Sequence, residues 1–283
     1  MIIDVHVHPV AKSMIKDHRN LKFMKRHADL LCETPIETLL AKMDSAGISK
    51  SCLLGPNHLD GISLSNEEVH ELVQKHPDRF VGFVGVDPQR QGNLTTRALI
   101  EQAVDIWKFR GIGEFGGGDF LTSDWDIVYE VAMEKNIPVL VHTGIPLPSM
   151  KLRYSHPTMI DRLATKFPNL KIIAAHIGAP WFFKTIEIAA KHPNVYIDIS
   201  AVPKFKLPII PILLAICIKR GVEDRILFGS DFPVVDPARY AASVDRMQIP
   251  ALLTLVRTMP PITDAIKRKI LGGNAEKLLG LSY

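Results

Sequence analysis

The chain has 283 residues, 47% hydrophobic and 23% charged, the composition of a globular protein large enough to bury a substantial core. Its net charge of +4 is spread without a long basic run, which favours a small, anionic substrate slightly and predicts no nucleic-acid partner. The longest apolar run, residues 207–218, is too short to cross a bilayer, so we expect no membrane partner.

The cysteines and the first residues of the chain indicate a cellular compartment. Cys32, Cys52 and Cys217 are odd in number and widely spaced, which is typical of a reducing compartment. Strand-like sequence from Ile2 leaves no room for a signal peptide, so we expect a cytoplasmic protein. The run 207–218 is interpreted as a buried helix beginning near Pro211, with a homodimer contact as the alternative.

Apolar runs and amphipathic stretches alternate along the chain. The runs predict strands at 2–8, 50–55, 80–87, 111–115, 138–143, 171–177, 195–200 and 225–231. The stretches predict helices at 34–47, 65–76, 95–108, 124–137, 157–167, 183–191, 211–220 and 237–247. Helix starts are expected at Thr34 (followed by Pro35 and Glu37), Ser65 and Asp124, and Gly47 is expected to end the first helix.

Eight strand-then-helix units predict the fold class. Alternating β and α elements indicate a parallel sheet, and eight units in a chain of this length indicate a closed (β/α)₈ TIM barrel. We expect one domain, residues 1–283, with one or two extra helices outside the barrel after Pro260. A doubly wound open sheet is the alternative, because periodicity does not prove closure.

Ionisable residues recur near the carboxyl ends of five predicted strands. Alternation predicts shared faces for Asp4, His6 and His8; for Ile112 and Glu114; for Leu140 and His142; for Ala174 and His176; and for Leu227, Gly229 and Asp231. Barrel active sites lie at this end. Taken singly, each residue has an ordinary interpretation, such as a buried histidine bonded to backbone or a carboxylate in a turn.

Together these side chains point to a metal ion. Four imidazoles and two carboxylates at one buried end would each need separate compensation, whereas one divalent ion serves them all. The absence of cysteine from the set favours an open catalytic site over a structural one. We therefore expect one or two divalent ions, with zinc as the first candidate and manganese as the second.

Six segments carry a family resemblance. They are "DVHVHP", "GIGEFGG", "VHTG", "AHIG", "HPNVYIDIS" and "ILFGSDFP". In this order the chain resembles the amidohydrolase superfamily over nearly its whole length. The last four segments are most similar to the amidohydrolase 2 branch, which includes aminocarboxymuconate-semialdehyde and resorcylate-type decarboxylases. The fold implied is a (β/α)₈ barrel.

The resemblance implies roles for particular residues. His6, His8, His142 and Asp231 would be metal ligands, and His176 would be a second-metal ligand or a catalytic residue. Glu114 stands where many two-metal members have a carboxylated lysine, an arrangement similar to that of TatD-type deoxyribonucleases and phosphotriesterase-like hydrolases. It would bridge two metals or orient a water.

Three functions are compatible with this set. The first is a metal-dependent hydrolase of a small amide, ester, lactone or phosphoester, in which Asp231 takes a proton from a metal-activated water and His176 polarises the substrate. The alternative is a metal-dependent non-oxidative decarboxylase of an aromatic or enolic carboxylate, with Asp231 or His176 as the acid. A non-catalytic metal-binding barrel is the least favoured.

The loops after the strands are expected to bind the substrate. Arg153, Tyr154 and Trp181 are the candidate substrate-binding residues, and the loop after the first strand adds Lys12, Lys16, His18 and Arg19. Asp4 is interpreted as a backbone-bonding residue beneath the site, with support of a metal-bound imidazole as the alternative. For Asp198 and Ser200, a polar interior layer and substrate contact remain alternatives.

Overall fold

The computed structural model describes residues 1–8, 35–56, 64–205, 209–248 and 259–281. Eight strands pair in parallel in chain order. They are β1 (Ile2–Val7), β2 (Ile48–Leu54), β3 (Phe80–Val84), β4 (Gly111–Phe115), β5 (Val139–Val141), β6 (Ile172–Ala174), β7 (Val195–Asp198) and β8 (Ile226–Leu227). The strands are mostly shorter than expected, because the chain leaves the sheet just before several of the polar residues.

Backbone hydrogen bonds join the first strand to the last. The Val5 N–H donates to the Phe228 carbonyl at 3.0 Å, and the Asp231 N–H donates to the His6 carbonyl at 2.8 Å. Val7 also forms a parallel bridge with Phe232. These contacts close the sheet, so the (β/α)₈ barrel is confirmed and the open-sheet alternative is wrong.

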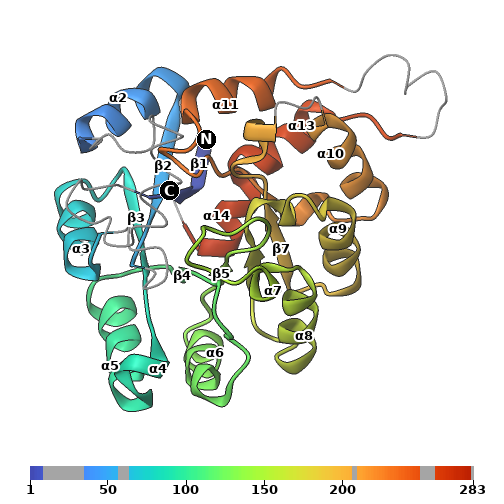
Figure 1. The fold of residues 1–283 in the computed structure, drawn as a ribbon. Coiled ribbons are helices and arrows are strands. Elements are labelled where there is room, and N and C mark those ends of the chain that lie inside the picture. Colours follow the sequence, from blue (N-terminus) through green and yellow to red (C-terminus); the bar gives the residue numbers. More distant parts are fainter. Residues whose placement is uncertain (9–34, 57–63, 206–208, 249–258, 282–283) are drawn as a thin grey trace.

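Helices surround the strands as a ring in chain order (Figure 1). The α-helices are α2 (Ile36–Ala46), α3 (Asn66–Lys75), α4 (Pro88–Gln91), α5 (Asn93–Glu101), α6 (Asp126–Glu134), α7 (Leu152–Ser155), α8 (Thr158–Lys166), α9 (Phe182–Lys191), α10 (Ile210–Lys219), α11 (Pro237–Asp245), α13 (Asp264–Arg268) and α14 (Asn274–Leu279). Shorter turns are η3 (Gln102–Ile106), η4 (Ser123–Trp125), η5 (Ala175–Gly178), η6 (Val202–Phe205), η7 (Glu223–Arg225) and η8 (Lys269–Gly273). None of the helices in the described ranges is long and apolar enough to span a membrane.

Local sequence explains where several helices begin and end. Ser65 caps α3 with the expected capping box, and Gly47 ends α2 in the left-handed conformation. Helix α2 begins at Ile36, so Pro35 occupies the cap position, and Thr34 lies outside the described residues. The predicted start at Asp124 is wrong, because a short 3₁₀ turn contains this residue and α6 follows it.

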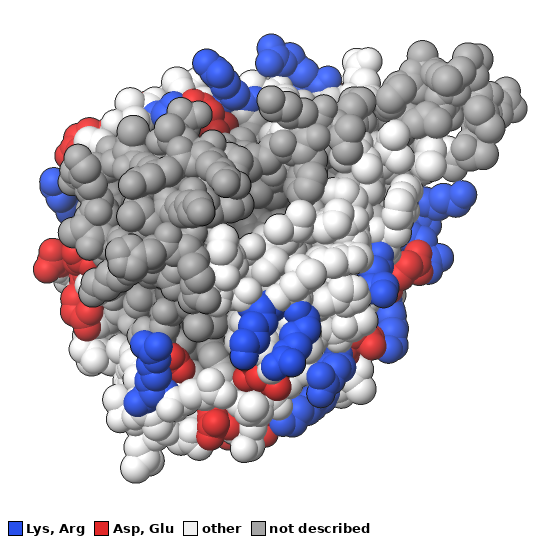
Figure 2. Space-filling model, viewed as in Figure 1, with Lys and Arg blue, Asp and Glu red and all other residues white. Residues whose placement is uncertain are grey.

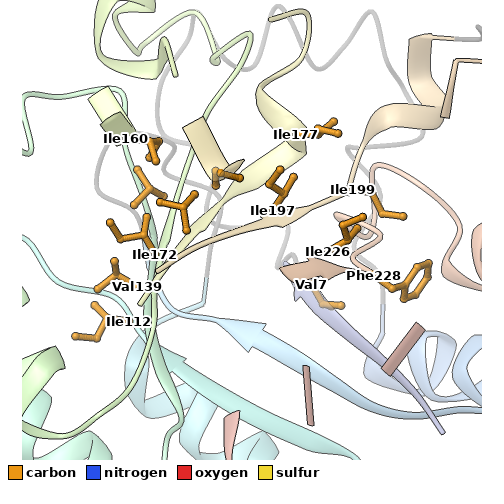
Figure 3. Packing of buried hydrophobic residues seen from close by; sticks show 14 of the residues in the cluster. Val7, Ile112, Val139, Ile160, Ile172, Ile177, Ile197, Ile199, Ile226 and Phe228 are labelled. Atoms are coloured by element: carbon orange, nitrogen blue, oxygen red, sulfur yellow. The ribbon is translucent and has the colours of Figure 1, made fainter. Parts of the chain in front are cut away.

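The hydrophobic core has two layers. The larger cluster joins strand residues such as Val139 and Ile172 to helix residues such as Ile160, and so fills the space between strands and helices (Figure 3). The smaller cluster combines strand residues such as Ile3 and Leu140 with α14, and its described members include no residue of the surrounding helices. It therefore fills the barrel interior.

The C-terminal helix belongs to this inner layer. Ala275, Leu278 and Leu279 pack in the inner cluster, and Asn274 Nδ2 donates to the carbonyls of Glu223 and Ile226 at the start of β8. The expectation that the tail lies outside the barrel is therefore wrong for α14. This helix closes the amino end of the barrel and leaves the carboxyl end for the polar residues.

Charged residues on the outer face are interspersed. Figure 2 shows Lys and Arg beside Asp and Glu over the described part of one face. Cross-helix pairs such as Lys166–Asp126 at 2.6 Å and Lys191–Asp161 at 2.7 Å connect neighbouring helices. Exposed pairs of this kind contribute little to stability, so burial of the two apolar layers holds the barrel together.

The plug formed by α14 gives a stability prediction. Leu278 is 4% exposed, and Leu278→Ala should lower the free energy of unfolding by about 2–4 kcal/mol, because it opens a cavity in the inner layer. Leu94 is 88% exposed, so Leu94→Ala is the matched control and should change it by less than about 0.5 kcal/mol. Urea denaturation followed by circular dichroism measures both, and equal effects would contradict the plug.

Candidate metal centre

Six candidate residues meet at the carboxyl end of the barrel. His6 and Glu114 lie on β1 and β4, whereas the other four lie just beyond strand ends: His8, His142, His176 and Asp231. The predicted strands 138–143, 171–177 and 225–231 are therefore too long. The prediction that these side chains converge is confirmed, because hydrogen-bond and ion-pair contacts connect all six.

Simple strand alternation does not explain the convergence at two positions. Ile112 and Ala174 pack in the outer layer, so the predicted shared faces of Ile112 with Glu114 and of Ala174 with His176 are wrong. The β4–β5 pairing is irregular between Ile112 and Phe115, which re-aims Glu114 inward. His176 is turned inward by a left-handed backbone conformation just after β6. Leu140 and Leu227 do face the interior, as expected.

The first group of atoms surrounds His6. Its Nε2 lies 3.1 Å from His8 Nε2, 3.5 Å from Glu114 Oε2 and 3.5 Å from Asp231 Oδ1. His8 Nε2 lies 3.3 Å from Glu114 Oε2 and 3.7 Å from Asp231 Oδ1. Ligand atoms at about 2.0–2.2 Å from one ion lie about 2.8–3.1 Å apart in octahedral geometry and about 3.3–3.6 Å apart in tetrahedral geometry. The five distances, from 3.1 to 3.7 Å, are close to this spacing.

The second group uses the other oxygen of Glu114. Its Oε1 lies 3.0 Å from His142 Nδ1 and 3.4 Å from His176 Nε2, and these two nitrogens are 3.3 Å apart. Each oxygen of the Glu114 carboxylate thus faces two imidazole rings. His142 belongs to this second group, away from the immediate contacts of His6 and His8.

Asp198 supports both groups from beneath. Its Oδ2 accepts a hydrogen bond from His6 Nδ1 at 2.8 Å, and its Oδ1 accepts from the backbone N–H groups of His176 and Ser200, each at 2.9 Å. The Ser200 hydroxyl donates to the same Oδ1 and lies 2.8 Å from His176 Nδ1. Asp198 and Ser200, which the sequence left undecided, therefore support the site residues. Their placement two residues apart at the end of one strand was the available signal.

Asp4 bonds to backbone, in agreement with its main interpretation. Its Oδ1 accepts from the Ser230 N–H at 2.9 Å and from the His6 N–H at 3.2 Å. It ties the loop after β8 to β1 and so places Asp231 near His6. Burial raises the pKa of Asp4 to about 6, against the opposing effect of these hydrogen bonds.

Unusual backbone conformations gather at this end of the barrel. His176, Ile177, Ala201 and Asp231 all have positive φ, between 47° and 61°, and they follow β6, β7 and β8. A left-handed conformation costs a non-glycine residue about 1–2 kcal/mol. The turn at His176 is held by its backbone N–H, which donates to Asp198 Oδ1, and the Asp231 N–H donates to the His6 carbonyl. Such strain at a cluster of ionisable groups is typical of functional sites.

Electrostatics within the cluster favour ionised carboxylates. Burial opposes the charge of Glu114, but the neighbouring His6 and His142 outweigh it and hold its pKa well below the usual range. Burial likewise opposes protonation of His6, yet Glu114 and Asp198 raise the pKa of His6 well above its usual value. The site therefore requires positive charge, which protons or a metal ion can supply.

The residues fit a divalent metal ion. The donors are imidazole nitrogens and carboxylate oxygens, which suit zinc and manganese. His6 donates its Nδ1 proton to a carboxylate, so its unprotonated Nε2 faces the cluster when the ring is neutral. His142 Nε2 is buried without a hydrogen-bond partner among the described residues. His8 and Asp231 keep side-chain exposures of 12% and 13%, which leaves this edge accessible.

The three expected substrate-binding residues lie apart from these contacts. Arg153 on α7 donates to the Tyr154 hydroxyl at 2.8 Å, and its guanidinium lies 4.6 Å from the Tyr154 ring centre. Trp181 follows His176 in the same loop, where its N–H bonds the Gly178 carbonyl and its ring packs edge-on against His156. Among the described residues, no hydrogen bond, ion pair or ring contact joins these three to the cluster. Lys12, Lys16, His18 and Arg19 lie outside the described residues.

A comparison with protein families decides the assignment. The sequence model of the Amidohydrolase family matches residues 3–281. The chain belongs to the amidohydrolase family. The search of curated proteins found no match to this sequence.

Solved structures of similar fold include decarboxylases. An uncharacterised TIM-barrel protein from Bordetella bronchiseptica has 22% identity and a TM-score of 0.74, covering 99% of this chain and 98% of that one. A dihydroxybenzoic acid decarboxylase from a Polaromonas species, with bound manganese and 2-nitroresorcinol, has 18% identity and a TM-score of 0.65, covering 99% and 97%. A 5-carboxyvanillate decarboxylase from Novosphingobium aromaticivorans, with manganese and a nitrobenzoic acid, has 17% identity and a TM-score of 0.67, covering 99% and 96%. At these identities the likeness establishes the fold.

The electrostatics of His6 predict pH-dependent metal binding. An ion that takes the Nε2 lone pair must displace the proton that His6 retains up to its raised pKa. Affinity for manganese should therefore fall as pH is lowered between about pH 8 and pH 6, by up to about tenfold per unit for each proton displaced. Calorimetric titrations in buffers of different ionisation enthalpy measure this release. Constant affinity without proton release would contradict the assigned role of His6.

Proposed function

We propose that this amidohydrolase-family protein is a metal-dependent enzyme that removes carbon dioxide from a small aromatic or enolic carboxylate. The observation that carries the proposal is the cluster of His6, His8, Glu114, His142, His176 and Asp231 at the carboxyl end of the barrel. Solved structures of similar fold support the proposal, because two of them are named as decarboxylases of hydroxybenzoate-type acids and contain manganese together with an aromatic ligand.

The metal ligands proposed are His6, His8, Glu114 and Asp231, with His142 and His176 available to a second ion. Two sets of three ligand atoms each lie within 4.8 Å of one another, one from His6, His8 and Asp231 and the other from His6, Glu114 and His176. A bound divalent ion would supply a Lewis acid that attracts the carboxylate or phenolate oxygen of the substrate. Manganese and zinc are the two candidates. His8 and Asp231, the least buried members, form the edge at which a substrate enters.

Decarboxylation exchanges a carbon–carbon bond for a carbon–hydrogen bond, so the site must deliver one proton to the carbon that loses carbon dioxide. His176 is suited to this role because Ser200 fixes its Nδ1 and leaves Nε2 facing the cluster. Glu114 Oε1 lies 3.4 Å from that nitrogen and can accept a hydrogen bond from it. Asp231 is the second candidate for the acid.

A hydrolase is the second candidate function, and one observation favours it. Glu114 faces two imidazoles with each carboxylate oxygen, which is the arrangement expected of a carboxylate that bridges two ions. In that reaction Asp231 would take a proton from the attacking water and pass it to the leaving group. The substrate would be an amide, ester, lactone or phosphoester.

One experiment separates these functions. The purified protein is loaded with manganese or zinc and offered hydroxybenzoates, with release of carbon dioxide measured, and in parallel offered lactones, amides and phosphate esters. We expect release of carbon dioxide from a hydroxybenzoate. Turnover of the hydrolytic substrates alone would replace the decarboxylase proposal with the hydrolase one. Metal binding without turnover of either set would favour the binding barrel.

Variants of two site residues should behave differently. His6→Ala removes a proposed ligand and should lower metal affinity by more than about 100-fold. Loss of a residue that only supports a ligand usually lowers the affinity by about 10–100-fold. Asp231→Asn keeps an oxygen near the ion but loses the proton-carrying carboxylate, so it should lower turnover by about 100-fold or more while reducing affinity less.

Metal content and turnover of the two variants measure these effects. His70→Ala is the control, because His70 stacks on Trp107, among aromatic residues outside the cluster. Retention of metal and activity by both site variants would contradict the assignment. A cytoplasmic location and a homodimer remain predictions from the sequence.

A further inference from the structure

Asp198 contacts both groups of the cluster, through His6 in the first group and His176 in the second. Unlike Glu114, it does so from beneath the cluster, through His6 Nδ1 and the His176 backbone. It is fully buried. Its Oδ2 is bonded to His6, and its Oδ1 is bonded to His176 and Ser200. We propose that Asp198, acting with Ser200, is a positioning residue that sets the tautomers of His6 and His176 together. The inference rests on the proposed metal centre but not on the reaction.

The tautomer of His6 follows from hydrogen-bond chemistry. A carboxylate only accepts hydrogen bonds, so the 2.8 Å contact between Asp198 Oδ2 and His6 requires a proton on Nδ1. The neutral ring then presents the lone pair of Nε2 to His8, Glu114 and Asp231. This is the form of histidine that binds a metal ion.

The tautomer of His176 follows through the hydroxyl of Ser200. That hydroxyl has one proton, which it donates to Asp198 Oδ1. Its oxygen must therefore accept at the 2.8 Å contact with His176, which places a proton on Nδ1 of that ring. Nε2 of His176 is then the free position of the ring, 3.4 Å from Glu114 Oε1 and 3.3 Å from His142 Nδ1, and it is the atom that can take up and deliver a proton. One carboxylate thus orients a proposed ligand and the proposed proton carrier.

An amide at position 198 cannot reproduce this arrangement. Three donors converge on Oδ1, so the oxygen of Asp198→Asn will face them and its NH₂ group will face His6. An NH₂ donor requires the lone pair on His6 Nδ1, which moves the ring proton to Nε2, where the ion binds. If the amide is turned the other way, its NH₂ group faces the N–H groups of His176 and Ser200, and donors then oppose donors.

The test compares variants by metal affinity and ring protonation. Asp198→Asn should lower the affinity for zinc by about 10–100-fold. Asp161→Asn is the control, because Asp161 on α8 also contacts a histidine ring, His192 Nε2 at 2.8 Å, but lies outside the cluster; this variant should bind zinc with wild-type affinity. Ser200→Ala removes the 2.8 Å contact with His176 Nδ1 and a longer 3.3 Å contact with His6 Nδ1. Because the 2.8 Å bond to Asp198 remains, His6 should stay Nδ1–H, whereas His176 loses its constraint.

Nitrogen-15 NMR of the zinc-loaded wild-type protein measures the tautomers directly and needs no variant to fold. Nδ1–H on both His6 and His176 supports the inference, including when His176 also carries a proton on Nε2. A ring of either histidine that lacks Nδ1–H overturns it, as does wild-type zinc affinity of a folded Asp198→Asn. If the wild-type protein takes up neither zinc nor manganese, the metal centre itself is wrong. The tautomers of the metal-free protein, recorded where both rings are neutral, then still decide the role of Asp198.

Discussion

Buried negative charge is the constraint on which the carboxyl end of this barrel depends. Glu114 and Asp198 are enclosed with the imidazoles of His6, His142 and His176, and the histidines hold the pKa of each carboxyl below its usual value despite burial. Removing any one partner would leave an uncompensated charge in an environment of low polarity. The backbone around the site, including its left-handed residues, is arranged to keep these partners in contact.

The rest of the fold offsets the free-energy cost of these buried charges. Apolar packing on both sides of the strands provides the stabilisation, and α14 completes the inner layer at the amino end. The carboxyl end therefore need not be filled with apolar side chains. Asp4 and Asp198 connect this end to the strands by hydrogen bonds to backbone, so the polar cluster rests on rigid elements.

The same cluster suits two chemistries because both need a divalent ion and a nearby proton carrier. The family comparison is compatible with either chemistry, and the position of Glu114 between two pairs of imidazoles is the observation that favours hydrolysis. The difference lies in what binds beside His8 and Asp231, and neither Arg153 nor Trp181 makes a described contact with the cluster. Substrate identity is thus a property of the loops more than of the metal ligands.

The sequence by itself determined the order of strands and helices, the barrel class and the six residues of the cluster, because periodicity and strand-end position are local properties. Tertiary structure decided the closure of β1 on the segment after β8, the place of α14 in the inner layer, and the side to which Glu114 and His176 point. The last of these depends on an irregular strand pairing and a left-handed turn, which break the alternation that the sequence suggests. Tertiary structure also decided the contacts of Asp198, because its partners lie 22 and 192 residues away and only the closed barrel brings them within hydrogen-bonding distance.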